Sequence, residues 1–337
     1  MLTMQKQKLC YLCPSLVLFL FSSALLSSGA ELCNPTEKEA LLEIKHSLGN
    51  PHILRSWTPN TDCCKTWYKV ACDSQSNRVI WLKVQYSHLV GQISPAIGRL
   101  TSLQIVSFYK LPNLYGTIPQ SITNLKNLQF LELAHANLTG PIPLFLTQIH
   151  SLTDLLLTDN QFSGSIPPSL VQLANLENLS LDRNKLIGSI PENFGSFRNP
   201  ILYLTLSGNQ LSGPIPRSLA NGNFSTLDLS RNKLAGDAAF LFGNGKLFEI
   251  DLNGNSLSFD LSNVKFYEYL QHIDISRNKI YGRIPTSLTK LMDLHYLNVS
   301  YNSLCGPIPA GGLLQSFNET SYFHNKCLCG APLLSCK

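Results

Sequence analysis

One sequence pattern recurs ten times between Val79 and Pro309, with a period of 23 to 25 residues. Its consensus is L-x-x-L-x-L-x-x-N-x-L-x-G-x-I-P. The two clearest copies are Leu155, Leu157, Asn160, Phe162, Gly164, Ile166 and Pro167, followed by Leu179, Leu181, Asn184, Leu186, Gly188, Ile190 and Pro191. Leucines at alternate positions predict a short strand, and the Gly and Pro then end it and turn the chain. The pattern therefore restricts the chain to folds that repeat one small unit.

A single unit of this pattern is too small to fold alone. About seven apolar side chains contribute roughly 1.5 to 3 kcal/mol each when buried, whereas ordering about 24 residues costs roughly 1 to 2 kcal/mol per residue in backbone entropy. Neighbouring units must therefore share core surface and strand hydrogen bonds. The pattern is that of a leucine-rich repeat, and it predicts an α/β solenoid of about ten stacked turns with an exposed row of strands.

The repeats define the predicted domain organisation. We expect a signal peptide at 1–30, an N-terminal cap at 31–78, ten leucine-rich repeats at 79–309 and a C-terminal cap at 310–337. Lys6 and Lys8 precede an apolar run at 16–26, and small residues follow it, which is typical of a secretory signal peptide. A membrane anchor is the alternative, but the run is short for a span, and no later segment approaches one. We therefore expect a secreted protein without a membrane span.

Seven of the repeats carry an asparagine at the same position. We expect these side chains to point into the stack, where each amide satisfies backbone groups of adjacent turns that would otherwise be buried without partners. They are Asn160, Asn184, Asn209, Asn232, Asn255, Asn278 and Asn302. Ser87 and Ala136 occupy this position in two early turns, and the seventh and eighth turns lack I-P after Leu234 and Leu257. We expect local irregularity there and an unbroken stack.

The cysteines lie at the two ends of the chain. Outside the predicted signal peptide there are eight, which are Cys33, Cys63, Cys64 and Cys72, then Cys305, Cys327, Cys329 and Cys336. This distribution indicates disulfides that staple the caps, and hence an oxidising compartment. Four cysteines allow three connectivities in each cluster, although a bond between the adjacent Cys63 and Cys64 is disfavoured by geometry. Zinc is the alternative, but no histidine stands at zinc-finger spacing, so we expect no metal.

The N-terminal cap has a predicted helix. Thr36 and Glu39 have the spacing of a capping box, and Leu41, Ile44 and Leu48 fall on one helical face. We expect a helix from about Thr36 to Leu48 that covers the open core of the first turn. The residues expected to fill the space beneath the adjoining loop are Trp57, Trp67 and Val70.

Glycosylation sequons are a further indication of secretion. There are five, at Asn137, Asn178, Asn223, Asn298 and Asn318. Without Lys6 and Lys8 the formal net charge falls from +5 to +3. This weak positive charge is not concentrated in a stripe with interleaved aromatics, so we do not expect nucleic-acid binding.

The residues that alternate with the leucines of each strand form an exposed surface. Between the paired leucines lie Lys83, Ser107, Glu132, Leu156, Ser180, Thr205, Asp228, Asp251, Asp274 and Asn298. Beside them are Asp154, Asp159, Glu177, Asp182 and Glu249, with Arg183, Arg231 and Arg277 at the strand exits. The aromatic residues are Trp81, Tyr86, Tyr109, Phe130, Tyr203, Phe248, Tyr296 and Tyr301. A solvated face is one interpretation, but exposed aromatics with acidic groups favour an interface for a basic protein partner.

An enzyme is the main alternative to a binding protein. His272, Asp274 and Ser276 project from one strand, but alternate residues on a strand are about 6 to 7 Å apart. This spacing prevents a hydrogen-bonded catalytic chain, and an open sheet offers no oxyanion hole. Asp251 and Asp274, on adjacent strands, lack the enclosing cleft of a glycosidase. We therefore expect no enzymatic activity and no cofactor.

Both ends and one irregular turn carry a family resemblance. The N-terminal cap reads E-L-C-N-P-T-E-K-E-A-L-L-E-I-K and then S-W-T-P-N-T-D-C-C-K-T-W-Y-K-V-A-C-D. The C-terminal part reads N-V-S-Y-N-S-L-C-G-P-I-P-A-G-G-L-L-Q-S-F and N-K-C-L-C-G-A-P-L-L-S-C, and the seventh turn reads G-D-A-A-F-L-F-G. With these segments, its ten repeats and its eight cysteines, the chain from Glu31 to Lys337 resembles the plant polygalacturonase-inhibiting proteins.

The resemblance implies a curved right-handed solenoid in the plant cell wall whose concave strand face blocks fungal endopolygalacturonases. It implies cysteines paired in sequence order, as Cys33–Cys63, Cys64–Cys72, Cys305–Cys327 and Cys329–Cys336. Carried onto this chain, the acidic inhibitory surface and its flanking contacts are Glu132, Asp154, Asp159, Asp182, Asp228, Asp251 and Asp274, with Tyr109, His135, Tyr203 and Arg183. For the pectin binding of some members, the candidates are Arg183, Arg231 and Arg277. We expect a monomer.

Two features depart from the family pattern, and two other functions share the scaffold. Leu156 places an apolar side chain at mid-face, and Asn298 would place a glycan on the last strand. The segment K-L-P-N-L-Y-G also resembles an ice-binding relative from carrot, but ice binding calls for a flat repeated row of Thr or Asn, whereas this face is charged and irregular. A soluble co-receptor is the third possibility, because the sequence has no membrane span or kinase motif.

Overall fold

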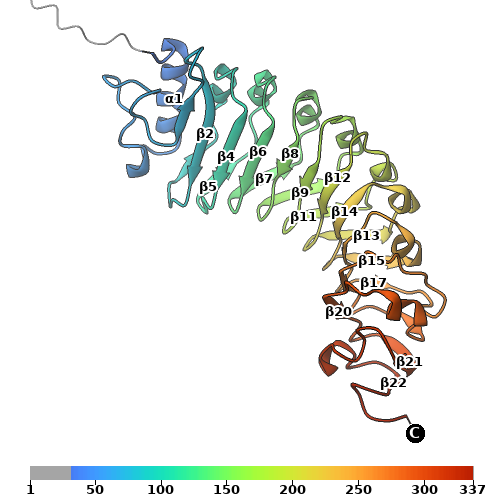
Figure 1. The fold of residues 1–337 in the computed structure, drawn as a ribbon. Coiled ribbons are helices and arrows are strands. Elements are labelled where there is room, and N and C mark those ends of the chain that lie inside the picture. The colour runs from blue at the N-terminus through green and yellow to red at the C-terminus, as the bar shows by residue number, and fades with distance from the viewer. Residues whose placement is uncertain (1–31, 337) are drawn as a thin grey trace, which may run out of the picture. The chain divides into compact units, whose positions relative to one another are not determined.

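The first half of each repeat forms one strand of a long sheet (Figure 1). The structure, a computed structural model, describes residues 32–336. The sheet has eleven strands, in the order β1 (Val70–Cys72), β2 (Val79–Gln85), β4 (Ile105–Tyr109), β6 (Phe130–Ala134), β8 (Asp154–Leu156), β10 (Asn178–Ser180), β12 (Ile201–Thr205), β14 (Phe224–Asp228), β16 (Glu249–Asp251), β18 (His272–Asp274) and β20 (Tyr296–Asn298). β1 is antiparallel to β2, and the other neighbours pair in parallel. This confirms the predicted leucine-rich repeat solenoid.

The second half of the repeat forms two further sheets that the sequence analysis did not predict. One has eight strands, in the order β17 (Ser256–Leu257), β15 (Lys233–Gly236), β13 (Gln210–Pro214), β11 (Lys185–Gly188), β9 (Gln161–Ser165), β7 (Asn137–Pro141), β5 (Leu114–Gly116) and β3 (Gly91–Gln92). The other has three, β19 (Tyr281–Gly282), β21 (Ser303–Pro307) and β22 (Cys327–Cys329). These strands are short and most of them contain Gly, so they lack the alternation by which a strand is predicted.

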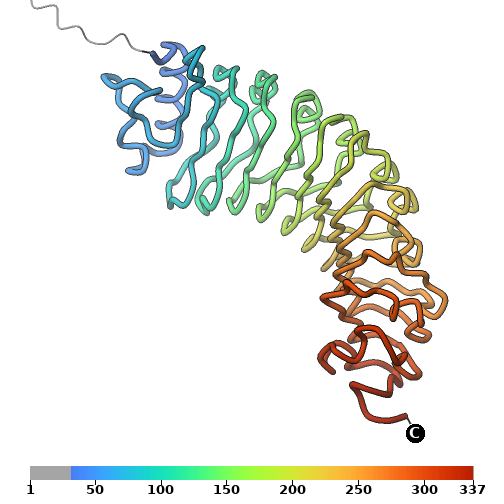
Figure 2. The backbone as a smooth tube through the Cα atoms, in the orientation of Figure 1, coloured from blue at the N-terminus to red at the C-terminus, as the bar shows by residue number. Residues whose placement is uncertain are grey.

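Most of the short 3₁₀ helices connect a strand from the second half of one repeat to the next strand of the long sheet. The helices are η1 (His52–Leu54), η2 (Pro95–Arg99), η3 (Gln120–Asn124), η4 (Leu144–Gln148), η5 (Pro168–Gln172), η6 (Phe194–Ser196), η7 (Arg217–Asn221), η8 (Ala239–Gly243), η9 (Thr286–Lys290) and η10 (Glu319–Ser321). Five of them, η3, η4, η5, η7 and η9, begin directly after the I-P of a repeat. Figure 2 shows that the coils of residues 32–336 follow one another along a bend, with the short helices of the repeats on its outer side.

The predicted inward asparagines form a continuous series of hydrogen bonds, here called the asparagine ladder. Asn184, for example, donates from Nδ2 to the carbonyl oxygens of Leu157 at 2.9 Å, Leu181 at 3.0 Å and Asp182 at 3.1 Å. Its Oδ1 accepts the Phe162 N–H at 3.1 Å. The same contacts recur at Asn160, Asn209, Asn232, Asn255, Asn278 and Asn302. The predicted structural role is confirmed.

The ladder extends one step further than predicted. Asn325, in the C-terminal cap, accepts the Leu304 N–H and donates to the carbonyl oxygens of Val299 and Tyr322. Its position 23 residues after Asn302 was a usable signal in the sequence. The cap therefore closes the stack by continuing its hydrogen-bond pattern.

The coils that lack I-P are irregular, as predicted. In the eighth coil, β17 is two residues long, and an isolated bridge joins Asp260 to Tyr281 where the eight-stranded sheet ends. The long sheet continues through this region, because β16 pairs with β18 over three residues. The irregularity is confined to the flank of the stack.

The N-terminal helix α1 covers the first coil, but its cap differs from the prediction. α1 runs Pro35–Ser47, and Asn34 is its N-cap, with Oδ1 accepting the N–H groups of Thr36 and Glu37. The predicted capping box of Thr36 and Glu39 is therefore wrong. Asparagine is a preferred N-cap residue and proline a preferred first helical residue, so Asn34–Pro35 outcompetes Thr36.

A buried acidic side chain fastens this helix to the stack. Glu37 is fully buried and accepts both the Arg78 Nε–H at 2.8 Å and the Val79 N–H at 2.9 Å. Beneath the cap, Trp57 and Trp67 stack with ring centroids 5.3 Å apart, as expected for core residues.

Four disulfides close the two caps. They are Cys33–Cys63, Cys64–Cys72, Cys305–Cys327 and Cys329–Cys336, the pairing implied by the family resemblance. The sulfurs of Cys33, Cys63 and Cys64 lie close together, but all three are in disulfides and so are not thiolate ligands for zinc.

The predicted signal peptide lies outside the residues that the structure describes. Among residues 32–336, no helix has the length and apolar character needed to cross a membrane. The division of the rest of the chain into caps and repeats stays a prediction in its boundaries.

Candidate functional site

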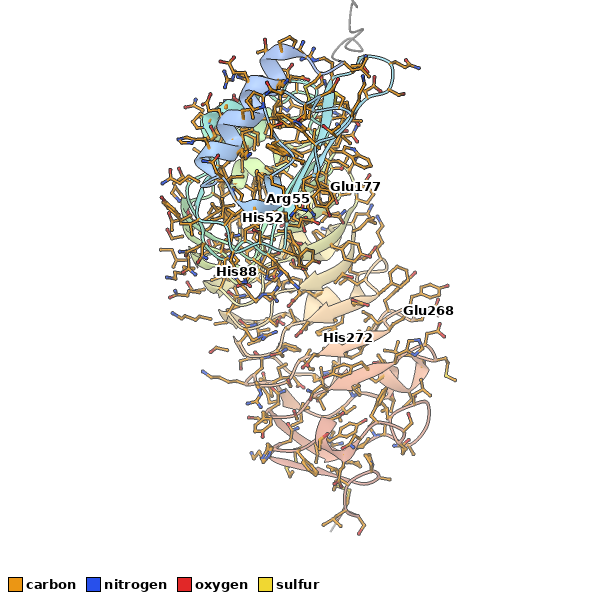
Figure 3. All side chains as sticks on the ribbon, turned by 90° about the vertical axis from the view of Figure 1, so that its left-hand side faces the viewer. His52, Arg55, His88, Glu177, Glu268 and His272 are labelled. Carbon is orange, nitrogen blue, oxygen red and sulfur yellow. A yellow bond between two sulfur atoms is a disulfide. The ribbon has the colours of Figure 1, made fainter. Side chains whose placement is uncertain are left out.

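The outward side chains of the eleven-stranded sheet form one surface, here called the strand face. Figure 3 looks onto this surface and labels Glu177 and His272 along it. Strand pairing places the same repeat position side by side in successive coils. The central row is Lys83, Ser107, Glu132, Leu156, Ser180, Thr205, Asp228, Asp251, Asp274 and Asn298, as predicted. The row before it includes Trp81, Phe130, Asp154, Asn178, Tyr203, Glu249, His272 and Tyr296.

Three aspartates of the central row accept hydrogen bonds from the backbone just beyond the ends of their strands. Asp228, Asp251 and Asp274 each accept the backbone N–H of the residue two positions ahead, at 3.0, 2.9 and 2.9 Å. Asp274 also accepts the Tyr296 hydroxyl at 3.3 Å and is only 7% exposed. The expectation that this side chain is openly exposed is wrong, because the next coil covers it. These three aspartates therefore hold the backbone in place where their strands end.

Asp251 lies between two like charges. The pKa of Asp251 is raised to about 6, mainly by burial and to a smaller extent by the flanking carboxylates of Asp228 and Asp274. Hydrogen bonds from Asn253 act in the opposite direction. At neutral pH the folded protein therefore holds a partly desolvated carboxylate beside two others.

The raised pKa of Asp251 predicts that neutralising this side chain increases the free energy of unfolding by an amount that depends on pH. Because its pKa is higher in the folded state than in the unfolded chain, folding binds a proton between about pH 4 and 6. The stability due to this proton is lost as the pH rises through 6. Asp251→Asn should therefore raise the free energy of unfolding at pH 7 by roughly 1 to 2 kcal/mol, allowing for solvent screening. The gain should shrink toward pH 4.

Thermal unfolding from pH 4 to 8 checks this prediction, with the wild type measured at each pH. Glu249→Gln is a suitable control, because Glu249 lies on the same face and is exposed. A gain for Asp251→Asn that is the same at every pH would contradict the assignment.

Two other acidic residues predicted to contact a partner also accept hydrogen bonds from neighbouring coils. Asp182 is 8% exposed and accepts the hydroxyls of Thr158 at 2.7 Å and Thr205 at 3.2 Å, while Arg183 pairs with it at 3.3 Å. Glu132 accepts the Ser107 hydroxyl. Exposed acidic side chains on or beside this face are Asp159, Glu177 and Glu249. The strand face therefore presents fewer exposed carboxylates than the sequence suggested.

An aromatic and basic cluster lies at the N-terminal end of the strand face. The Tyr109 ring contacts Tyr86 and His135 edge to face, with centroids 5.4 and 5.1 Å apart respectively. Lys110 Nζ lies 5.3 and 5.4 Å from the two tyrosine ring centroids. His135 Nδ1 is 2.7 Å from Asp159 Oδ2. Four of these residues, Tyr86, Lys110, His135 and Asp159, border an open cavity of about 610 Å³.

The sequence analysis named Tyr109, His135 and Asp159 but missed Lys110. Tyr86, Lys110, His135 and Asp159 occupy the same repeat position, and each has a positive φ of 52 to 56°. An alignment of the repeats at the residues that follow each strand would have placed Lys110 in one group with Tyr86, His135 and Asp159.

Tyr203 is an exposed aromatic residue at the middle of the strand face. It lies on β12 with 51% of its surface exposed. Its neighbours in the same row are Asn178 on β10 and Thr226 on β14. A large, exposed ring at mid-sheet is the type of side chain that anchors a protein interface.

The three predicted pectin-binding arginines are not grouped in one site. Gly208 and Gly254 occupy the same repeat position in the coils between them. Arg183 pairs with Asp182, and Arg277 lies 4.3 Å from the ring centroid of Tyr301. Pectin binding by these residues stays a prediction.

The residues tested as a catalytic set do not form one. His272 stacks on Tyr296 with centroids 4.3 Å apart, and Asp274 accepts the backbone N–H of Ser276. No contact among these three side chains forms the hydrogen-bonded chain of a hydrolase.

Comparison with known proteins supports the leucine-rich repeat assignment and gives the family. The leucine rich repeat N-terminal domain model matches residues 34–73, and the Leucine Rich Repeat model matches 151–173, 175–197, 201–221 and 269–291. The polygalacturonase inhibitor of Vitis vinifera is 50% identical over 357 aligned positions, covering 99% of this chain and 100% of the relative. The polygalacturonase inhibitor of Pyrus communis is 52% identical, covering 94% and 96%. The chain belongs to the polygalacturonase-inhibitor family.

Membership of the polygalacturonase-inhibitor family confirms the resemblance read from the capped ends and the repeats. It also confirms that the chain is a binding protein and not an enzyme, since the relatives are inhibitors with leucine-rich repeats. Among solved structures, the crystal structure of a plant ice-binding protein has a TM-score of 0.88 and 47% identity, covering 90% of this chain and 98% of that chain. Proteins named as polygalacturonase inhibitors and a protein named as ice-binding are thus both similar to this chain.

Proposed function

We propose that this protein is secreted into the plant cell wall and inhibits fungal endopolygalacturonases by binding them through its strand face. The observation that carries this proposal is the 50% identity to a named polygalacturonase inhibitor across essentially both full lengths. The five sequons and the disulfide-stapled caps support an extracellular location.

The composition of the strand face supports its role as the binding surface. It combines exposed aromatics, such as Trp81, Tyr203 and Tyr296, with the acidic residues Glu177 and Glu249. Aromatic side chains supply buried contact area in an interface, and charges orient the partner and raise the encounter rate. A rigid sheet holds these groups in place without the entropy loss of an ordering loop. A partner with a basic patch fits this surface.

The direct test is an inhibition assay against a panel of fungal endopolygalacturonases. The full-length protein should be produced in a plant host, and the release of reducing ends from polygalacturonate should be followed at increasing inhibitor concentration. We expect inhibition of at least one enzyme and complex formation with it on a sizing column. Absence of both with every enzyme of a broad panel, for protein made with and without N-glycosylation, would refute the proposal.

A matched pair of tyrosines tests the binding surface. Tyr203→Ala should weaken inhibition by roughly ten-fold or more, because it removes an exposed anchor from the middle of the strand face. Tyr115→Ala is the control, since Tyr115 is 44% exposed but lies on β5 in the eight-stranded sheet. Both variants should keep the wild-type melting temperature within a few degrees. Equal inhibition by the two variants would remove the strand face from the proposal.

Ice binding is the second candidate function, because of the likeness to a plant ice-binding protein. The strand face argues against it, since its central row mixes Lys, Glu, Leu and Asp and shows no repeated Thr or Asn. Thermal hysteresis measured on the same preparation decides between the two. Ice shaping without inhibition would reverse the ranking.

A further inference from the structure

Two of the five sequons lie on the strand face, which is the surface proposed to bind the enzyme. Asn178 is on β10 and Asn298 is on β20. Asn137 lies instead on β7 of the eight-stranded sheet, and Asn318 is an exposed residue of the C-terminal cap. A glycan at Asn178 or Asn298 would therefore compete with a protein partner on this face. Asn318 lies away from the face, and Asn137 borders the cavity beside Tyr86 and His135 at its N-terminal end.

The two sequons on the strand face differ in position along the sheet. β10 is the sixth of the eleven strands, and β20 is the last. Asn178 pairs with Asp154 on one side and with the exposed Tyr203 on the other. A glycan at Asn298 would occupy the end of the face, but a glycan at Asn178 would occupy its centre.

The contacts of the Asn178 amide fix which of its two polar atoms faces Asp154. Nδ2 donates one hydrogen to Asp154 Oδ1, and Oδ1 is buried without a hydrogen-bond partner. The reverse orientation would turn the amide oxygen toward a carboxylate, which is repulsive. Nδ2 carries a second hydrogen, which is the one that an N-linked sugar replaces, so glycosylation is compatible with the bond to Asp154.

We propose that Asn178 is an N-glycan acceptor and that its sugar covers the strand face from β8 to β12, preventing a polygalacturonase from binding there. The inhibitory effect of the glycan rests on the proposed function. An N-linked oligosaccharide is larger than any side chain in the row, so it shields Tyr203 and Asp154 together. The form without a glycan at Asn178 is the active inhibitor, and occupancy of this one site sets the active fraction.

Two substitutions at one position test this proposal. Ser180→Ala removes the sequon and Ser180→Thr keeps it, and both suit a strand position of intermediate burial. Each variant and the wild type should be made in a glycosylating plant host and, as a second set, in a bacterial periplasm without N-glycosylation. Glycopeptide mass spectrometry measures occupancy at Asn178. Iodination of Tyr203, relative to Tyr115, measures shielding of the face independently of any partner.

From the plant host, Ser180→Thr should carry the glycan at Asn178. Its Tyr203 should be labelled at least about five-fold more slowly than that of Ser180→Ala. It should also inhibit at least about ten-fold more weakly than Ser180→Ala. The bacterial pair measures the effect of the side chain at position 180 itself, and the plant-host differences are read relative to it. A bare Asn178 in both the wild type and Ser180→Thr, or equal labelling of Tyr203 in occupied and bare protein, would overturn the proposal. Equal inhibition by occupied and bare protein would overturn its inhibitory part. If no protein inhibits, including the bacterial set, the proposed function fails, while the labelling still decides whether the glycan covers the face.

Discussion

Asn184→Ala should lower the free energy of unfolding by about 3 kcal/mol, one of the two largest effects that we expect from this structure. The Asn184 side chain is 8% exposed, and its amide bonds four backbone groups in two successive coils. Alanine removes all four contacts and leaves the buried Phe162 N–H without an acceptor. Because water does not reach this position, the cost of the orphaned groups is not recovered by solvation.

A second asparagine in the same coil is the control for this prediction. Asn175 also donates from its amide to a backbone carbonyl, that of His150 at 2.9 Å, but it is exposed, so water can replace the bond. Asn175→Ala should cost less than about 1 kcal/mol. Urea unfolding followed by circular dichroism measures both variants. Similar losses for Asn175→Ala and Asn184→Ala would show that burial of the ladder is not what makes it stabilising.

Removal of the first disulfide should have an effect of similar size. Cys33→Ala with Cys63→Ala opens a loop with a sequence separation of 30, for which the loop-entropy relation gives about 3 to 4 kcal/mol. Both cysteines are buried, so alanine avoids placing new polar atoms in the cap. Removing the bond increases the entropy of the unfolded chain most when the closed loop is long.

The last disulfide provides a matched comparison at the other end of the chain. Cys329–Cys336 closes a separation of only 7, and its removal in Cys329→Ala with Cys336→Ala should cost about 2 kcal/mol. The two double variants should be compared by thermal unfolding under identical non-reducing conditions. A larger loss from the short loop than from the long one would contradict the entropic explanation.

The repeat pattern predicted the parts of the fold that depend on period alone. Leucines at alternate positions decide which side of a strand faces the core, and a repeat of nearly constant length places equivalent residues side by side. The central row from Lys83 to Asn298 and the inward asparagines could therefore be read from the sequence before any contact was known. Family resemblance supplied the cysteine pairing, which spacing alone left open.

Other features depended on competition between local interactions or on contacts with neighbouring coils. The capping box of Thr36 and Glu39 had the right spacing, but Asn34 with Pro35 formed a better helix start. Asp182 and Asp274 point to the predicted side, yet neighbouring coils cover them. An outward direction therefore does not establish exposure.

The sequence by itself determined the stacked repeats, the rows of the strand face and the asparagine ladder, because each follows from the period of apolar and amide side chains along the chain. Only the tertiary structure decided which of those outward residues a partner could reach and how strongly burial and neighbouring carboxylates raise the pKa of Asp251. Solvent access and charge interactions depend on distances between coils, and a one-dimensional pattern does not contain those distances.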